Sequence, residues 1–557
     1  MFDDLRAQRG RWLLLAMVAF GLSYSVLPLY SSNQNHHLLT GIARAGEGWL
    51  IDDWLVHTVD PFPLATGVVW LVHRFAFDAI DYVLYFLLLG AYAYGLMRVA
   101  EHLWPVRRET AALERLWWLT IMCLLHNEVV GYLLGVDLPR LPWWQMTHWG
   151  VAEQEIFGHS MFQPSAVGLL LPLALAWHLD GRPVRAATLT GAVLLVHFSY
   201  VLIGACLVSA FMVTAAQRTR SLVAPAVIGA VGLAFAIPAI IYVVARLSPT
   251  DAETSRRSAA ILVGHIRQEA DPHVWLGAKA AVQVLWMIAG VVLASGTELF
   301  LALLAPLLLG VALTSAQIAS GNTQLALLFP WRVSVLLVPV STALIVRALI
   351  AHAAQGRAWT TRHRQLQRLA GAAITLSALL GCIRMTLTFA YFYDDRPLTA
   401  RLDRVVPERW RRDFAKALRP DTLPMMEFVR ETAIRGDLYV VPPELERFRL
   451  RTGAPIVADA KSHPYKDVEV IEWYTRLQLV STFYGTSDCD VLRAIANRYA
   501  ATHVVLDERV RRGRCPGLAR VYSDPVFEVD RIVGTADAKI GYSACCDLTA
   551  RFDSPVP

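Results

Sequence analysis

Residues 186–216 read AATLTGAVLLVHFSYVLIGACLVSAFMVTAA, and this stretch decides how the chain can cross a membrane. It is about 30 residues long, whereas a helix needs about 20 apolar residues to span a bilayer. The more polar residues 197–200 (HFSY) interrupt it near the middle. The stretch therefore forms either one long helix or two short helices that reverse direction at His197.

The charges on the flanking loops favour two helices. Further apolar runs lie at residues 12–30, 80–104, 115–136, 164–180, 222–245, 276–294, 298–317, 330–350 and 369–391. If the basic residues 6–11 are cytoplasmic, the later basic loops are also cytoplasmic only when 186–216 crosses twice. The positive-inside rule therefore predicts about eleven spans, with the first retained as a signal anchor.

Composition supports this class of protein. Of the 557 residues, 55% are hydrophobic and 18% are charged, and the mean hydropathy is +0.41. These values are typical of a polytopic membrane protein that contacts membrane lipid. The net charge of +6 comes from basic residues at the ends of apolar runs, so it does not indicate a nucleic-acid partner.

The predicted topology divides the chain into two domains. Residues 1–391 form a mostly α-helical membrane domain, with outer loops at 31–79, 137–163 and 246–275. Residues 62–77 are expected to form an interfacial or re-entrant helix. Residues 392–557 form a small α/β domain outside the membrane, with helices at 425–432, 468–479 and 491–499 and strands at 438–441, 455–458, 503–506 and 526–529. The tail cysteines Cys489, Cys515, Cys545 and Cys546 allow three disulfide pairings.

Two acidic clusters lie in outer loops, close to where helices enter the membrane. One is Asp52-Asp53, and the other is Glu153-Gln154-Glu155. Carboxylates at such places can bind a divalent cation or accept a proton from a reacting hydroxyl group. The alternative is that they are solvated loop acids or helix caps.

Several short motifs resemble type-C glycosyltransferases (GT-C). Residues 33–39 read NQNHHLL, residues 52–53 DD and residues 60–63 DPFP, which resembles the first outer loop of that superfamily. Residues 150–155, GVAEQE, are similar to its acid-x-acid motif. The tail elements FR (448–449), KSHP (461–464) and EWYTR (472–476) look like those of an uncharacterised bacterial multi-span family. Asn33 is a departure, because the superfamily usually has an acid at this point.

The resemblance implies a function and a set of site residues. The protein would transfer a sugar from a polyprenyl-phosphate donor to a lipid, glycan or protein acceptor of the bacterial envelope. It would work at the outer face of the inner membrane, with its N-terminus cytoplasmic and its tail periplasmic. The assigned roles are catalysis for Asp53 and Asp52, Mg²⁺ or Mn²⁺ binding for Glu153, Glu155 and His159, and binding of the donor phosphate for Arg332 and His197.

Other interpretations remain open from the sequence. Asn33 is also compatible with a non-catalytic envelope assembly protein of the same architecture. The charges Glu128 and Arg384 within apolar runs are compatible with a transporter or lipid flippase, although we expect Glu128 to pair with Arg384 or His197. In the tail, the basic residues Arg449, Lys461, His463 and Arg476 could bind an acceptor, but we expect them to pair with Glu472 and Asp459 and hold the small domain together.

Overall fold

The computed structural model describes residues 2–533 apart from 25, 78, 128, 131–147, 159–160, 394–400, 405, 407, 409–419 and 510–514. The chain forms two compact units. The membrane unit consists of Met1–Ala45, Thr58–Pro420 and Pro464–Ile471. The small unit consists of Gly46–His57, Asp421–His463 and Glu472–Pro557. A piece of the first loop thus belongs to the small unit, and a piece of the tail belongs to the membrane unit.

Among its described residues, the regular elements of the membrane unit are helices, which irregular segments and one isolated bridge, Trp149 to Glu155, connect. Its α-helices are α1 (Phe2–Ser23), α2 (Gln34–His37), α3 (Leu39–Ala45), α4 (Pro63–Phe75), α5 (Ala79–Leu103), α6 (Ala111–Leu125), α9 (Leu171–Leu179), α10 (Pro183–Val196), α11 (Val201–Thr219), α12 (Val223–Leu247), α13 (Ala252–His265), α14 (Arg267–Ala270), α15 (Pro272–Trp275), α16 (Ala278–Leu293), α17 (Leu299–Ser320), α18 (Ser334–Ala353), α19 (Arg357–Thr361) and α20 (His363–Phe392). Short 3₁₀ helices are η4 (Val151–Glu153), η5 (Pro164–Leu170), η6 (Phe198–Tyr200), η7 (Thr323–Leu328) and η8 (Pro330–Val333).

Six helical segments of the described chain are long and apolar enough to cross a bilayer. They are Ala79–Leu103, Phe198–Thr219, Val223–Leu247, Leu299–Ser320, Thr323–Ala353 and His363–Phe392. Shorter apolar helices are Gly10–Ser23, Pro164–Leu179, Pro183–Val196 and Ala278–Leu293. The protein is therefore a multi-pass membrane protein, while the count of about eleven spans stays a prediction.

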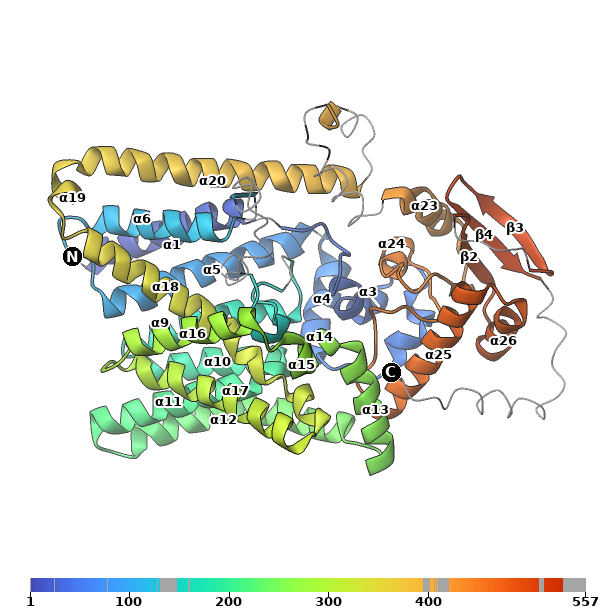
Figure 1. Cartoon of the computed structure of the whole chain (residues 1–557), viewed down its shortest axis with the longest axis horizontal. Coiled ribbons are helices and arrows are strands. Elements are labelled where there is room, and N and C mark those ends of the chain that lie inside the picture. Colours follow the sequence, from blue (N-terminus) through green and yellow to red (C-terminus); the bar gives the residue numbers. More distant parts are fainter. Residues whose placement is uncertain are drawn as a thin grey trace. The chain divides into compact units, whose positions relative to one another are not determined.

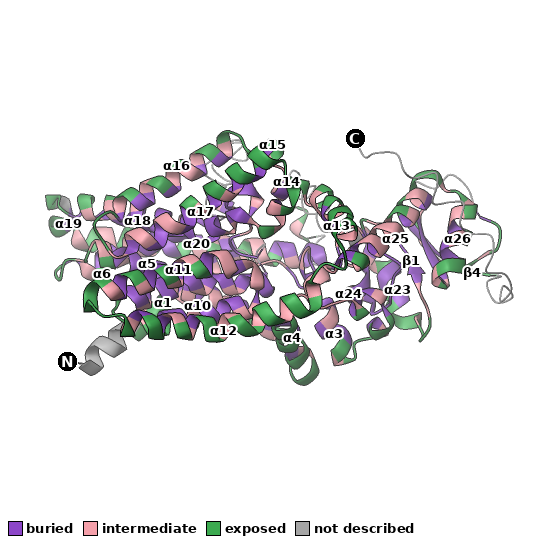
Figure 2. Cartoon of the chain, turned by 90° about the horizontal axis from the view of Figure 1, so that it is seen from below, coloured by how far each residue is buried: buried purple, intermediate pink, exposed green. Residues whose placement is uncertain are grey.

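Helix α12 shows why the surrounding medium must be lipid. Its apolar side chains point outward, with Leu233 55%, Ile241 61% and Val244 62% exposed. Figure 2 shows exposed residues along the outer face of this helix. A continuous apolar surface of this kind is unfavourable in water and is typical of a helix that contacts acyl chains.

The stretch 186–216 forms two helices, as the loop charges predicted. Helix α10 ends at Val196, His197 adopts an extended conformation (φ −141°, ψ 101°), and α11 begins at Val201. With a rise of about 1.5 Å per residue, the 14 residues of α10 are shorter than a full span. The break places polar groups of residues 197–200 at the ends of both helices.

The long helices of the membrane unit run side by side (Figure 1). Helices α3, α4, α14 and α15 lie at one end of this bundle, and α19 lies at the other. Near the α19 end, the side chain of Arg347 forms a buried ion pair of 2.6 Å with Glu114. Such a pair neutralises two charges that would otherwise be costly to bury.

The small unit is built around a four-stranded sheet. Its strands are β1 (Tyr439–Val440), β2 (His503–Asp507), β3 (Leu518–Ser523) and β4 (Phe527–Ile532), in the order β1-β2-β4-β3. Strands β1 and β2 are parallel, and β4 is antiparallel to both β2 and β3. The helical elements that lie wholly or partly in the small unit are η1 (Leu50–Asp52), η2 (Trp54–His57), η9 (Pro420–Thr422), α23 (Leu423–Thr432), α24 (Phe448–Thr452), α25 (Asp467–Thr486) and α26 (Cys489–Tyr499). The first residue of η9 and the first five of α25 belong to the membrane unit.

The sheet has one hydrophobic core on each face, because side chains alternate along a strand. Val505 of β2 packs with Met425 and Phe448 on one face, and Val504 packs with Phe483 and Ile495 on the other. The predicted helices and three of the predicted strands correspond to elements of this unit. Residues 455–458 form only an isolated bridge, Tyr439 to Ile456, and β3 was not predicted.

A disulfide joins Cys489 at the start of α26 to Cys515. This selects one of the pairings that the sequence left open. Cys545 and Cys546 lie outside the described residues.

Candidate functional site

The acid loop, residues 148–157, is held in a defined conformation in the membrane unit. The N–H of Gly150 donates to the Gln154 carbonyl (2.7 Å), and the N–H of Val151 donates to Ser334 Oγ (2.9 Å). Ala152 (φ 55°) and Glu153 (φ 51°) have left-handed backbone conformations, which are unfavourable for residues other than glycine. The surrounding contacts therefore maintain a strained turn that presents Glu155.

Glu155 is fixed by two side-chain amides. Asn33 Nδ2 donates to both carboxylate oxygens at 3.0 Å, and Gln163 Nε2 donates to Oε2 at 2.9 Å. Asn33, the departure from the GT-C pattern, thus directly contacts the acid-x-acid motif. An aspartate at position 33 would place a second carboxylate against Glu155 and repel it.

Glu153 faces different partners from Glu155. Its carboxylate accepts a hydrogen bond from Lys279 Nζ at 2.6 Å. His159, the third expected metal ligand, lies outside the described residues, within which no group of three or more His, Cys, Asp or Glu side chains is placed to hold a metal ion. Binding of Mg²⁺ or Mn²⁺ remains a prediction.

Arg332 lies in η8. This short helix begins directly after Phe329, another residue with a left-handed backbone conformation (φ 49°). Its Nε donates to Ser199 Oγ at 3.1 Å, and its guanidinium lies 5.4 Å from the centre of the Tyr200 ring. The Ser199 hydroxyl is in turn 2.7 Å from Nδ1 of His197. The break between α10 and α11 therefore supplies the polar groups that position this cation.

A cluster of aromatic and imidazole rings includes His197. The His197 ring stacks on Phe62 with ring centres 4.2 Å apart. Phe62 also contacts the rings of His37 (5.5 Å) and Tyr465 (5.8 Å), and His36 stacks on Tyr465 (5.6 Å). Rings from four separate segments thus form one surface.

These groups belong to a single site. Arg332 and Glu155 both lie close enough to the Tyr200 phenol to act on it electrostatically. Burial raises the pKa of Tyr465, while Arg332 opposes this effect and Glu269 adds to it. We call this set the Glu155–Arg332 site; its members are Asn33, His36, His37, Phe62, Glu155, His197, Arg332 and Tyr465.

The segment that carries Tyr465 is a strap from the tail, Pro464–Ile471, within the membrane unit. The Asp467 carboxylate accepts hydrogen bonds from the N–H (2.6 Å) and the hydroxyl (2.8 Å) of Thr250. The Glu469 carboxylate accepts from the N–H of Val59. Burial would raise the pKa of Asp467, but the donors of Thr250 and Val468 and the charge of Lys466 together outweigh it and hold that pKa below its usual value.

Asp53 lies in the small unit and is completely buried. Its carboxylate accepts hydrogen bonds from Arg449 Nε (2.7 Å) and from the N–H groups of Ile456 (3.0 Å) and Leu55 (2.9 Å). Arg449 also forms an ion pair with Asp459. These contacts favour a structural role for Asp53, and its catalytic role stays an untested prediction.

Other charged residues of the small unit also pair with one another. Burial raises the pKa of Asp459, although Arg449 and two backbone N–H groups oppose it. Asp52 is exposed, 3.7 Å from Arg435. Arg476 pairs with Glu472 at 2.9 Å, as expected for residues that stabilise the small unit. Glu128, expected to pair within the membrane, lies outside the described residues.

Backbone strain is concentrated near the site. Of the eight described non-glycine residues with positive φ, five lie in the segments that carry Asn33, Glu155 and Arg332; these five are Tyr30, Ser32, Ala152, Glu153 and Phe329. Strained residues persist where the surrounding structure fixes them, and they are frequent at functional sites. This clustering is independent of the side-chain contacts and indicates the same location.

Comparison with known proteins adds one finding. A family model described as "Domain of unknown function (DUF6798)" matches residues 420–480. The matched segment includes Arg449 and Asp459 of the small unit and Tyr465 and Asp467 of the strap. A search of curated proteins found no match to the chain.

Proposed function

We propose that the protein is a membrane transferase of the GT-C type that takes a sugar from a polyprenyl-phosphate donor. The observation that carries this proposal is that the Glu155 carboxylate and the Arg332 guanidinium lie in one site at one end of the helix bundle. Each is fixed by neutral donors or acceptors of the protein. The prediction from loop charges puts this end at the outer membrane face.

The proposed chemistry requires a base and a cation. Glu155 accepts the proton of the acceptor hydroxyl group while the oxygen of that hydroxyl group bonds to the anomeric carbon of the sugar. The bond from that carbon to the phosphate oxygen breaks, and polyprenyl phosphate leaves with the electron pair. Arg332 stabilises the developing negative charge, because its guanidinium can donate two parallel hydrogen bonds to phosphate oxygens. Glu155 then releases its proton to water.

Other members of the site have supporting roles in this proposal. Asn33 and Gln163 position Glu155, and Ser199 with His197 positions Arg332. The nearly perpendicular rings of Phe62 and Tyr465 provide apolar faces, against which a sugar can pack. Exposed apolar surfaces on the membrane helices are suitable for contact with the lipid tail of the donor.

The test is turnover by the full chain in liposomes. The protein would be given labelled polyprenyl-phosphate sugars and crude envelope acceptors, with Mg²⁺, with Mn²⁺ and with a chelator. We expect transfer of label by the wild type and a loss of about 100-fold or more in Arg332→Gln, comparable to removing one electrostatic stabiliser of a transition state.

Arg218→Gln is the matched control. Arg218 is a partly exposed arginine of the membrane unit that pairs with Glu298, at the end of α11 remote from η6. Its substitution should leave transfer within a few-fold of wild type. Equal activity of the Arg332→Gln and Arg218→Gln proteins, both folded, would contradict the proposal.

A further inference from the structure

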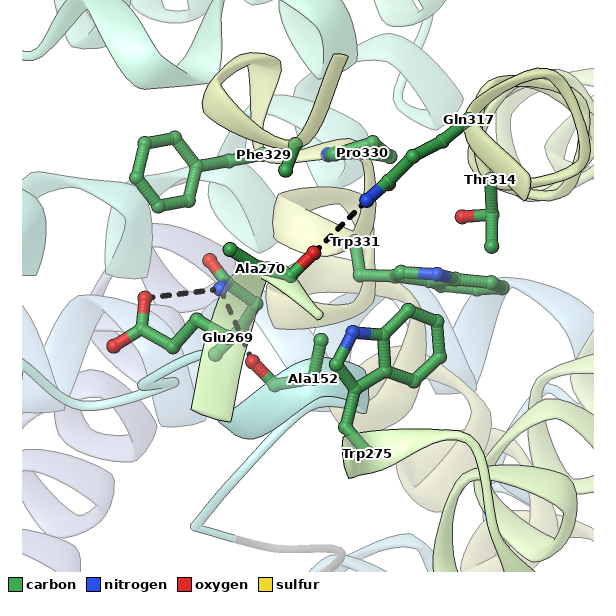
Figure 3. A pocket seen from close by; sticks show the side chains of 11 residues that line it. Ala152, Glu269, Ala270, Trp275, Thr314, Gln317, Phe329, Pro330 and Trp331 are labelled. Atoms are coloured by element: carbon green, nitrogen blue, oxygen red, sulfur yellow. Dashed lines mark hydrogen bonds between the residues drawn. The ribbon is translucent and has the colours of Figure 1, made fainter. Parts of the chain in front are cut away.

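A small hollow lies between the acid loop and η8 of the membrane unit (Figure 3). It is lined by side chains from the acid loop, α14, α15, α17 and η8, among them Gln154, Glu269, Trp275, Thr314 and Trp331. Gln154 precedes Glu155 in the sequence, and Trp331 precedes Arg332. The free space of the hollow is about that of a single water-sized group.

Four polar atoms of these lining side chains have no hydrogen-bond partner within the described chain. They are Nε1 of Trp275 and of Trp331, Oγ1 of Thr314 and Oε1 of Gln154. Three of the four residues are almost fully buried: Gln154 is 2%, Trp331 5% and Thr314 7% exposed. Because buried polar groups nearly always have partners, four such atoms around one hollow indicate a partner that is not among the described residues.

The lining limits what this partner can be. The indole N–H groups only donate, the Gln154 oxygen only accepts, and the Thr314 hydroxyl does either. A hydroxyl group satisfies such a mixed set, because it accepts from one neighbour and donates to another. Glu269 lines the hollow, and none of its described lining residues is Lys or Arg, so an anionic group is disfavoured.

The aromatic side chains add a rigid wall. The Trp275 and Trp331 rings lie 6.1 Å apart between centres at 75°, and Figure 3 shows them side by side beneath Pro330. Gln317 is held by its hydrogen bond to the Ala270 carbonyl at 2.9 Å. The hydrogen bond of Gln317 therefore fixes one lining side chain, and the two indole rings pack edge to face next to it.

We propose that the hollow receives one hydroxyl group of the sugar and so helps to select which sugar the protein takes. This inference rests on the proposed function, because it assigns the hollow to the same substrate. It names Trp275, Trp331, Thr314 and Gln154 as specificity residues, distinct from the groups that act on the reacting bond.

The experiment measures binding, which does not require turnover. Methyl glycosides of common hexoses and their monodeoxy analogues would be titrated against the full chain in nanodiscs, with saturation-transfer NMR as the readout. We expect at least one glycoside to bind the wild type, and Thr314→Val to weaken it about two- to tenfold, the range for one hydrogen bond. The deoxy analogue that lacks the inserted hydroxyl should show no further loss in the variant.

Thr190→Val is the matched control. Thr190 in α10 is also buried, and its hydroxyl also has no partner within the described chain, but it does not line the hollow. Both variants should be as thermally stable as the wild type or more so, because each loses a hydroxyl group that has no hydrogen-bond partner among the described residues. Only Thr314→Val should weaken glycoside binding.

Two results would overturn the proposal: no glycoside binds the wild type, or Thr314→Val and Thr190→Val bind equally well. Sugar transfer that continues with unchanged sugar preference in Thr314→Val would refute the role of the hollow in sugar selection, but it would not contradict the proposed function. Glycoside binding that depends on Thr314, in a protein that transfers no sugar, would support binding of a sugar hydroxyl group in the hollow and refute the proposed function.

Discussion

Substitution of Asp53 by asparagine should destabilise the small unit without changing the chemistry of the membrane unit. The variant replaces one carboxylate oxygen with an NH₂ group that faces the donors of Arg449 and Ile456. It loses one charge-assisted hydrogen bond, about 1.5–3 kcal/mol, and leaves a buried backbone donor poorly paired, about 1–3 kcal/mol. The expected cost is therefore about 2.5–6 kcal/mol, which includes the range of about 3–5 kcal/mol measured for breaking buried ion pairs.

Hydrogen exchange of the full chain, analysed by mass spectrometry, measures this effect locally. Peptides that contain β1, α24 and β2 should exchange faster in Asp53→Asn, whereas those of α5 and α18 should not change. Asp52→Asn is the matched control, because Asp52 is exposed and its distant pairing with Arg435 is worth about 0–1 kcal/mol. Unchanged exchange in Asp53→Asn, together with lost sugar transfer, would refute the structural role and restore the catalytic one.

Three further predictions follow from the site. Asn33→Asp should reduce transfer about 100-fold or more while Asn33→Ala reduces it less, because the new carboxylate repels Glu155; steady-state turnover in liposomes distinguishes the two. Arg332→Lys should recover only part of the activity lost in Arg332→Gln, since an ammonium group lacks the planar pair of donors, and the same assay measures this. The pKa of Asp467 is lower in the folded protein than in the unfolded chain. Asp467 therefore stabilises the fold at pH values above its unfolded pKa, and this stabilisation is lost as the pH falls through about 4 and below. The difference in Tm between wild type and Asp467→Asn should shrink over that interval.

The helices and the break at His197 could be predicted because both depend on local sequence. Apolar runs locate most of the membrane helices, and the polar residues 197–200 mark the break. Helix ends are less well predicted, because α1 ends at Ser23 and α6 at Leu125, before the ends of the runs 12–30 and 115–136. The Asp53 contact could not be predicted, since its partner Arg449 is 396 residues away. Strand β3 was missed because its residues are mostly exposed and lack the alternating apolar pattern of a strand with one buried face.

The candidate site was partly accessible from the sequence. Glu155 was selected as part of an acidic cluster in an outer loop, and Arg332 through the resemblance to GT-C enzymes. In the structure, Arg332 lies over the Tyr200 ring, and Glu155 is close enough to act on the Tyr200 phenol electrostatically. Tyr465 was missed because the small-unit residues on both sides of the strap gave no reason to place it with the membrane helices. His36 and His37 were quoted as part of a motif without a role; their position beside Phe62 and Tyr465 depends on packing, which no local pattern encodes.

The most direct measurement is the rate of sugar release from a polyprenyl-phosphate donor by Glu155→Gln, compared with Glu153→Gln and Glu253→Gln, in liposomes with protein shown to be folded. Glutamine keeps the size of the side chain and removes its ability to take a proton. We predict that Glu155→Gln is slower by about 100-fold or more, that Glu153→Gln stays within a few-fold of wild type because Glu153 is engaged by Lys279, and that the exposed Glu253→Gln is unchanged. Wild-type release rates in Glu155→Gln would contradict the assignment of this site.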